Sequence, residues 1–313
     1  MSQNFDQIAG VSRGPIRLVL PATSANLGSA FDTAGLAMGL TLTIAAEASP
    51  ASGPELSIEA TGRNADRCAR TVNNMIFETY RDVLARAGRS LTPLRLRIHN
   101  EIPLGMGCGS SAAALLGGVL LANHFGSLAW DLRACIDEAS RREGHPDNVA
   151  ACALGYMTVS AVTGGSVTAA TCGQDVGWKL MLALPPASLS TERARAMLPI
   201  AYTRADAVSN VQRSALLVAA FALDRGDLLR VATQDKLHQP YRMEACPLLG
   251  LLLPLAGESG VLGVALSGAG PAVMLVVGAD ADTAEVAARA RSAAGDPELE
   301  IILTSIAGGV TQS

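Results

Sequence analysis

Lysine is nearly absent from this chain of 313 residues, where it occurs only at Lys179 and Lys236. This scarcity excludes a Walker A phosphate loop, because that loop ends in Gly-Lys followed by Ser or Thr. The chain has no basic run and a formal net charge of −4, so it lacks the electrostatic footprint of a nucleic-acid-binding protein. None of its six cysteines forms a C-x-x-C pair, so we expect small core residues rather than a zinc site.

Long apolar runs are also missing. No stretch reaches the roughly 18 residues of a membrane span once Arg, Asn and His are counted as breaks. The start, Met1-Ser-Gln-Asn-Phe-Asp, lacks the basic and then apolar layout of a signal peptide. We therefore expect no membrane association and a cytoplasmic location, with residues 1–14 as a loose leader. The length suffices to bury a large core and favours two domains.

A glycine-rich segment, Pro103-Leu-Gly-Met-Gly-Cys-Gly-Ser-Ser-Ala-Ala-Ala114, joins a strand-like run at 94–99 to an apolar, helix-like run at 111–124. Its glycines permit positive φ and a close approach of a ligand to the backbone. The helix start adds unpaired N–H groups and the positive end of the dipole, which suit a phosphate. The spacing differs from the G-x-G-x-x-G dinucleotide fingerprint. The segment thus predicts a nucleotide loop that uses backbone N–H groups and serine, with a purely structural turn as the alternative.

Strands and helices are mixed in both halves of the sequence, which favours an α+β fold. We expect strands over 16–20, 40–46, 56–60, 94–99, 156–162, 178–184, 261–266, 272–277 and 299–304. We expect helices over 72–89, 111–124, 130–142, 147–154, 191–197, 204–224, 226–236, 245–255 and 281–294. Residues 21–32 read as a turn-rich loop, and the Gly-, Thr- and Ser-rich stretch 163–177 is the candidate domain boundary.

Four segments in order resemble the GHMP kinases, named after galactokinase, homoserine kinase, mevalonate kinase and phosphomevalonate kinase. The glycine-rich segment resembles their phosphate loop, and Leu266-Ser-Gly-Ala-Gly-Pro-Ala272 resembles their C-terminal motif. Pro21-Ala-Thr-Ser-Ala-Asn-Leu-Gly28 with Phe31-Asp32, and Glu143-Gly-His-Pro-Asp-Asn148, are similar to segments of the homoserine kinase branch. The resemblance implies the two-domain GHMP kinase fold. Residues 1–165 would form an ATP-binding domain like ribosomal protein S5 domain 2, and residues 166–313 a ferredoxin-like domain.

The resemblance implies ATP and Mg²⁺. The triphosphate is expected on the phosphate loop, with Ser111 and Glu143 as metal ligands; Asp137 and Glu138 are alternatives to Glu143. Asn74 matches a position near the adenine, although helix capping by Asn is the common alternative. The expected ATP-binding residues are Asn74, Pro103, Leu104, Gly105, Met106, Gly107, Cys108, Gly109, Ser110 and Ser111.

For the acceptor, the resemblance implies L-homoserine, phosphorylated to O-phospho-L-homoserine for threonine synthesis. A carboxylate suits the ammonium group of such a zwitterion, and the planar fork of arginine suits its carboxylate. The expected acceptor-binding residues are Asn26, Asp32, His145, Asn148, Arg195, Arg242, Ser267, Gly268 and Gly270, and catalytic roles are expected for Asn26, Asp32, Ser111 and Glu143. The resemblance implies that no strong base is used. The pairing of an acidic residue with a lysine, found in mevalonate kinase-like members, has no evident candidate here, because both lysines lie outside the motifs. For His145, a capping or supporting role is the alternative.

Two other functions stay open at this point: a GHMP kinase for a different small alcohol, and a catalytically silent ligand sensor on the same fold. A sensor would be favoured by loss of the serine pair or of the acidic metal ligands, and both are present. A serine hydrolase is not favoured, because no G-x-S-x-G elbow precedes a helix. Ser29 and Ala30 replace the Pro and Gly of the usual first motif, and Cys108 replaces the usual Leu of the phosphate loop. A homodimer is one assembly that the resemblance allows.

Overall fold

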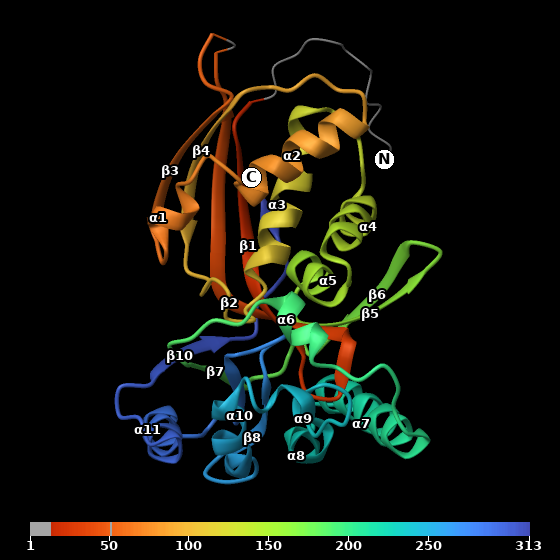
Figure 1. Cartoon of the computed structure of the whole chain (residues 1–313), viewed down its shortest axis with the longest axis vertical. Coiled ribbons are helices and arrows are strands. Elements are labelled where there is room, and N and C mark those ends of the chain that lie inside the picture. Colours follow the sequence, from red (N-terminus) through yellow and green to blue (C-terminus); the bar gives the residue numbers. More distant parts are fainter. Residues whose placement is uncertain (1–13, 51) are drawn as a thin grey trace.

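The computed structural model describes residues 14–50 and 52–313, which form an upper and a lower half along one long axis (Figure 1). The leader expected over residues 1–14 lies, apart from Gly14, outside the described residues. The upper half contains β1 (Ile16–Asn26), β2 (Ala30–Ala48), β3 (Leu56–Gly62), β4 (Leu94–Asn100), β5 (Met157–Thr163), β6 (Ser166–Cys172) and β11 (Thr311–Gln312). The lower half contains β7 (Lys179–Leu184), β8 (Val261–Leu266), β9 (Val273–Val277) and β10 (Glu300–Ser305).

The upper sheet has the strand order β11-β1-β2-β4-β3, and the hairpin of β5 and β6 joins it through β2. Its pairs are antiparallel except for the parallel pair of β3 and β4. Along β4, buried and exposed residues alternate, so one face of the sheet is covered and the other carries Arg95 and Arg97 to solvent. The covering layer is formed by α2 (Met75–Arg86), α3 (Ser110–Phe125), α4 (Leu132–Glu143) and α5 (Asp147–Leu154) (Figure 1).

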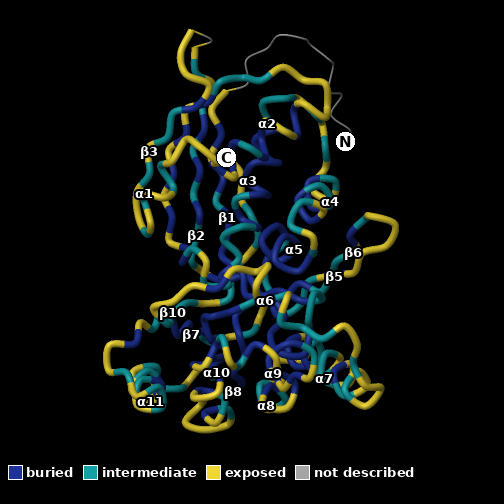
Figure 2. The backbone as a smooth tube through the Cα atoms, viewed as in Figure 1, coloured by how far each residue is buried: buried dark blue, intermediate teal, exposed yellow. Residues whose placement is uncertain are grey.

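Helix α3 lies at the centre of this layer because it is apolar on all sides, as a fully buried helix is. Gly117 and Gly118 let its neighbours approach closely. A Cβ at Gly117 would lie 2.8 Å from Cδ1 of Ile44, and a Cβ at Gly118 would lie 2.5 Å from the carbonyl oxygen of Ile76. Figure 2 shows α3 and α5 among the most buried elements of the upper half. The N-terminus of α3 points toward the junction of the two halves (Figure 1).

The lower sheet has the order β10-β7-β9-β8, with all neighbours antiparallel. On β7, Met181 and Ala183 pack in a cluster with α10 (Pro247–Leu252) and α11 (Thr283–Ala294), whereas the alternate residues Leu180 and Leu182 join the main core beside α7 (Arg204–Ala222) and α8 (Leu229–Ala232). Because alternate residues of a strand face opposite ways, helices cover both faces. The remaining elements are α1 (Ala65–Cys68), α6 (Thr191–Ala196), α9 (Gln239–Arg242) and short 3-10 turns at Gly226–Leu228 and Leu253–Leu255.

The hairpin of β1 and β2 links the halves, because its tip extends into the lower one (Figure 1). The Ser29 hydroxyl donates to the Ala232 carbonyl at 2.7 Å, and the Asn210 amide donates to the Ser29 carbonyl at 2.6 Å. The prediction of a loop over 21–32 is therefore wrong for most of its length. The turn-forming residues stay in strand pairing because two register shifts, after Pro21 and after Ala25, absorb them.

Most other expected elements are confirmed with ends shifted by a few residues, except that β2, expected over 40–46, begins ten residues earlier, at Ala30. Strand β6 was missed within the stretch 163–177, which was expected as a boundary. Elsewhere, the short elements α1, α9 and β11 were also missed. The helix expected over 226–236 contains only a 3-10 turn and the single turn of α8. The chain passes from the upper to the lower sheet between β6 and β7. The division into domains 1–165 and 166–313 stays a prediction. Among the described residues, no helix has the length and apolar character to cross a membrane.

Candidate active site

A pocket of about 210 Å³ lies at the junction of the two halves. The upper half contributes the glycine-rich loop with Gly105, Gly107, Cys108, Gly109, Ser110 and Ser111, and the segment that carries Glu143, His145, Asp147 and Asn148. The hairpin tip contributes Asn26, Phe31 and Asp32, and the lower half contributes Leu189, Ser190, Thr191, Arg195, Arg242, Gly268, Ala269 and Gly270. Six stretches that lie far apart in the sequence thus meet around one cavity.

The glycine-rich loop needs glycine at two positions because its neighbours leave no room for a side chain. Gly107 and Gly109 have φ of +79° and +71°. A Cβ at Gly107 would lie 2.1 Å from the carbonyl oxygen of Ser267, and one at Gly109 would lie 1.9 Å from Oγ1 of Thr23. The loop is therefore clamped between β1 and the turn that follows β8. The Ser267 hydroxyl adds a hydrogen bond of 2.9 Å to the Gly107 carbonyl.

The first turn of α3 faces this pocket and is not capped by a side chain of the described residues. Its leading N–H groups and the positive end of the helix dipole therefore remain available to an anion. Gly109 precedes the helix, and Ser110 and Ser111 form its first positions. This arrangement can bind phosphate oxygens without a lysine, as the spacing of the loop indicates.

Ser111 and Glu143 meet across the pocket, where the Ser111 hydroxyl donates to a Glu143 carboxylate oxygen at 2.8 Å. Burial raises the pKa of Glu143 above its usual value, and the bond from Ser111 only partly offsets this. The two alternative carboxylates are occupied elsewhere. Asp137 accepts bonds from the Val167 N–H and the Ser166 hydroxyl, while Glu138 pairs with two arginines of its own helix. An oxygen pair of hydroxyl and carboxylate beside a phosphate loop fits the ligand preference of Mg²⁺.

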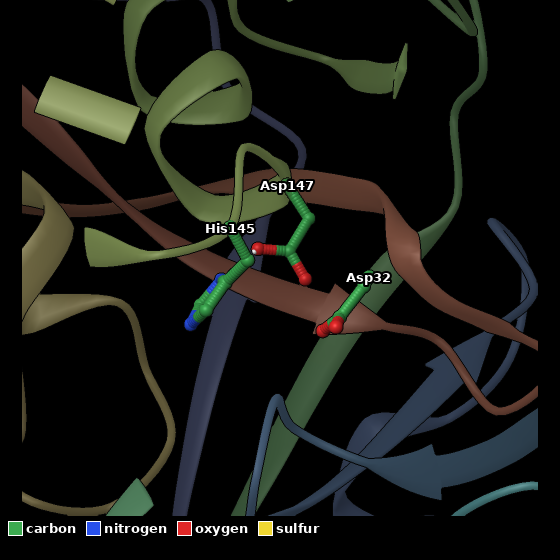
Figure 3. A group of neighbouring side chains, drawn as sticks. All are labelled: Asp32, His145 and Asp147. Carbon is green, nitrogen blue, oxygen red and sulfur yellow. Dashed lines mark hydrogen bonds and ion pairs between the residues drawn. The ribbon is translucent and has the colours of Figure 1, made fainter. Parts of the chain in front are cut away.

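Asp32, His145 and Asp147 form a second cluster, whose potential ligand atoms lie within 4.8 Å of one another. Figure 3 shows the Asp147 carboxylate between the His145 ring and the Asp32 carboxylate. His145 Nδ1 lies 2.6 Å from Asp147 Oδ1. Burial lowers the pKa of His145, but the bond and charge of Asp147 outweigh it, so the net pKa is raised. The cluster therefore offers a polar ligand both a ring nitrogen and carboxylate oxygens.

Asp32 is the acidic end of an ion pair across the junction. Arg195, on α6, donates to both of its carboxylate oxygens, at 2.7 and 3.0 Å. The Asp32 backbone has φ of +53° and is held by Asn26, whose Oδ1 accepts the Asp32 N–H at 3.0 Å. The Asn26 amide also donates to the Gly268 carbonyl at 2.8 Å. Asn26 therefore fixes where the Asp32 carboxylate points.

Arg242 is the second arginine of the pocket and is only 1% exposed. Its Nε donates to the Ala194 carbonyl at 3.1 Å. Burial lowers its pKa, and the like charge of Arg195 lowers it further. Phe31 separates the two cations, with its ring centre 5.6 Å from the guanidinium carbon of each. The pocket thus presents a carboxylate and two guanidinium groups around one aromatic ring.

The structure brings most of the expected site residues together in this pocket, while Asn74, Pro103, Leu104, Met106 and Ser267 do not line it. Asn74 caps α2, where its side chain accepts the Phe77 N–H at 3.2 Å and donates to the Arg70 carbonyl at 3.0 Å. Its expected place near the adenine stays a prediction. Sequence reasoning gave no role to Phe31, Leu189, Ser190 or Thr191, which also line the pocket.

Comparisons with known proteins agree with this geometry. The family model described as the GHMP kinases N terminal domain matches residues 74–156, and the model described as GHMP kinases C terminal matches residues 216–296. A curated homoserine kinase from Solibacter usitatus is 45% identical over 259 residues, covering 82% of this chain and 84% of that protein. The chain belongs to the GHMP kinase family. The resemblance noted in the sequence is confirmed, and membership of this family implies a transferase that uses ATP and a small-molecule substrate.

Solved structures match the fold of this GHMP kinase over nearly its whole length. A homoserine kinase from Cytophaga hutchinsonii has a TM-score of 0.81 at 20% identity, covering 99% of this chain and 100% of that one. A protein described as a homoserine kinase from Listeria monocytogenes has a TM-score of 0.73 at 27% identity, covering 95% of this chain and 99% of that one. The expected two-domain GHMP kinase fold with mixed helices and sheets is confirmed.

Proposed function

We propose that this GHMP kinase transfers the γ-phosphoryl group of ATP to the hydroxyl group of L-homoserine. The hydroxyl oxygen forms a bond to the γ-phosphorus, the bond to the β,γ-bridging oxygen breaks, and ADP, O-phospho-L-homoserine and one proton are the products. The curated relatives are named for this reaction. The phosphate loop opens into the same pocket as the charged side chains of Asp32, Arg195 and Arg242, which we call the acceptor wall. A direct transfer requires this arrangement.

The observation that carries the proposal is the charge pattern of the acceptor wall. A zwitterionic amino acid needs an anion for its ammonium group and a planar cation for its carboxylate. Asp32 and Arg195 supply both charges, and they pair with each other here. An incoming amino acid replaces this ion pair by two new ones. Its ammonium group pairs with Asp32 and its carboxylate pairs with Arg195, so neither side chain is left unpaired. Arg242 adds a second cation at the same end of the wall.

On the nucleotide side, Ser111 and Glu143 are the residues that would hold Mg²⁺. The metal ion neutralises charge on the phosphate oxygens when it is bound. The glycine-rich loop and the N-terminus of α3 bind the triphosphate through N–H groups. Engagement of Asp137 and Glu138 by other partners supports Glu143 as the acidic ligand.

The proton of the hydroxyl group leaves without a strong base. His145 lies in the pocket, and the contact of its Nδ1 with Asp147 Oδ1 at 2.6 Å orients the ring toward the bound amino acid. It contacts the amino acid together with Asn148. Asp32 orients the acceptor, and Asn26 orients Asp32. Positioning and charge neutralisation therefore carry the catalysis, as is usual for phosphoryl transfer.

The test is ADP release by the purified protein with Mg-ATP and a panel of alcohols. The panel holds L-homoserine, L-serine, L-threonine, mevalonate and galactose, with a control that lacks an acceptor. We expect turnover that depends on homoserine. Turnover with another alcohol alone would retain the kinase and overturn the assignment of the acceptor wall. ATP binding without turnover on any alcohol would favour the catalytically silent sensor. A homodimer stays a prediction of the family resemblance, and a cytoplasmic location stays a prediction of the sequence pattern.

A further inference from the structure

His238 is a fully buried histidine that lies beside the pocket and does not line it. It precedes the short helix α9, which carries Arg242. Its place is fixed by Asp235, whose Oδ2 accepts the backbone N–H groups of His238 and Gln239 at 2.8 and 2.6 Å. Its ring stacks on the Phe31 ring, with centres 5.4 Å apart and planes 26° apart. The ring therefore sits between the β1–β2 hairpin and the helix of Arg242.

The partners of the two ring nitrogens define one tautomer. Nε2 lies 2.8 Å from the Gly28 carbonyl oxygen, which can only accept, so Nε2 carries the proton. Nδ1 lies 3.1 Å from Nη1 of Arg242, which can only donate, so Nδ1 accepts. Protonation at Nδ1 would set an N–H group against the guanidinium. Burial lowers the pKa of His238 to about 4, in line with a neutral ring, and outweighs the Asp235 carboxylate, whose Oδ2 lies 3.5 Å from Nε2 and raises the pKa.

Three acceptors then fix the guanidinium of Arg242. Its Nε bonds to Ala194, and its Nη1 faces both His238 Nδ1 and, at 3.5 Å, the Gly268 carbonyl. The hydrogen bonds among the described residues leave Nη2 as the nitrogen that no partner uses, on a side chain that lines the pocket. The ring that aims Arg242 is anchored to Gly28, in the same hairpin tip as Asn26 and Asp32.

We propose that His238 is a positioning residue for acceptor recognition, which as the neutral Nε2–H tautomer holds Arg242 at a set distance from the hairpin tip that carries Asp32. The inference rests on the proposed function, because it takes Arg242 to bind the acceptor carboxylate. It explains why a polar ring is buried at a site where it touches no substrate. The Gly28 position supports this, because a Cβ there would lie 1.9 Å from the Thr233 carbonyl oxygen, so the tip packs directly against the backbone of the lower half.

The first test reads the tautomer in the unaltered protein by two-dimensional ¹H–¹⁵N NMR of the imidazole nitrogens. The chain has only four histidines, so the signals can be assigned with single substitutions. We expect His238 to be the neutral Nε2–H form at neutral pH and to remain so at about pH 5.5, well above its lowered pKa. A protonated ring or an Nδ1–H form would overturn the proposal, whether or not any variant folds.

The second test compares two substitutions that each keep one half of the ring's function. His238→Asn retains an acceptor near the position of Nδ1, and His238→Gln retains a donor near Nε2 but offers Arg242 nothing. We expect His238→Gln to raise KM for homoserine roughly 10- to 100-fold, with KM for ATP changed less than about threefold. His238→Asn should raise KM for homoserine much less than His238→Gln does. His99→Gln, on the exposed face of β4, is the matched control and should change neither constant.

A role in packing alone would give a different pattern. Equal losses in both His238 variants, or equal effects on the two KM values, would overturn positioning. In the Arg242→Leu background, His238→Gln should add less than about a twofold effect, because the residue through which it acts is gone. If His238→Gln raised KM for homoserine in the Arg242→Leu background as much as it does alone, the proposal would also be contradicted. The unaltered enzyme in the same assay separates the two hypotheses, because failure to phosphorylate homoserine removes the proposed function while the tautomer remains measurable.

Discussion

The nucleotide wall and the acceptor wall of the pocket are built from different parts of the chain. The nucleotide wall is one continuous segment, Gly105 to Ser111, which offers backbone N–H groups at a helix start. The acceptor wall is a set of charged side chains, Asp32, Arg195 and Arg242, from three distant segments. Backbone groups bind any phosphate of suitable shape. In the proposed function, the first wall therefore binds the triphosphate, and the side-chain charges of the second wall select the acceptor.

The largest effect is expected at Glu143, a side chain outside the nucleotide wall that accepts a hydrogen bond from the last residue of that wall, Ser111. Glu143→Gln removes the carboxylate that meets Ser111, and we expect kcat to fall about 10³-fold, since metal-assisted charge neutralisation contributes several kcal/mol. Steady-state ADP release measures it. Glu138→Gln, on the same helix, is the matched control and should leave kcat nearly unchanged. A large loss in the control with none in Glu143→Gln would move the metal site to Glu138.

A second substitution tests whether the nucleotide wall depends on its backbone. Gly107→Ala places a Cβ 2.1 Å from the Ser267 carbonyl oxygen, in addition to the strain of positive φ. We expect a loss of at least about 3 kcal/mol in the free energy of unfolding. Gly164→Ala, also at positive φ but in open space, should lose only about 1 kcal/mol. Urea unfolding measures both, and equal losses would show that the clamp by Ser267 is unimportant.

The acceptor wall is tested by Arg195→Gln. The substitution removes a charged partner of the amino-acid carboxylate and unpairs Asp32. We expect KM for homoserine to rise about 10- to 100-fold, the effect of a lost charge-assisted hydrogen bond, with KM for ATP nearly constant. Arg193→Gln, in the same helix, is the control. If both substrates were affected equally, Arg195 would belong to the fold rather than to the acceptor wall.

The smallest effect is expected at the pair of Asp147 and His145, which line the pocket but belong to neither wall. Asp147→Asn should lower the pKa of His145, because the bond and charge that raise it are weakened. A raised pKa in the folded state stabilises the protein fully below the ordinary value of about 6.5, and this contribution is lost as pH rises through the folded pKa. The variant should therefore lose stability at about pH 5.5 more than at about pH 8. NMR titration of His145 and urea unfolding at both values measure this, and an unchanged pKa would contradict the pairing.

The difference between the walls also explains what the sequence could predict. Gly105, Gly107 and Gly109 lie within five residues of one another, and their positive φ and the chemistry of the helix start follow from local rules. Asp32 and Arg195 were expected from the resemblance, but their ion pair joins residues 163 positions apart, which no local pattern reports. His238 carried no signal at all, because its role depends on Gly28 and Arg242 packed around it.

The fold shows the same limit. Strand β4 was predicted from its alternation of apolar and polar residues, and helix α3 from its long apolar run. Both patterns can be recognised within a short stretch of sequence. The hairpin tip at 21–32 was mistaken for a loop, since its Pro, Ser, Asn and Gly residues have turn chemistry while cross-strand pairing decides their state. Strand β6, the partner of β5, was missed, because the small polar residues from 163 onward resemble a linker.

The most direct test of the account removes one charge of the acceptor at a time. The kcat/KM for L-homoserine would be compared with those for 3-amino-1-propanol, which lacks the carboxylate, and for 4-hydroxybutyrate, which lacks the ammonium group. The account predicts that both analogues lose at least about 100-fold, because each leaves a buried or paired charge of the wall without a partner. An analogue phosphorylated as well as homoserine would contradict recognition by Asp32, Arg195 and Arg242.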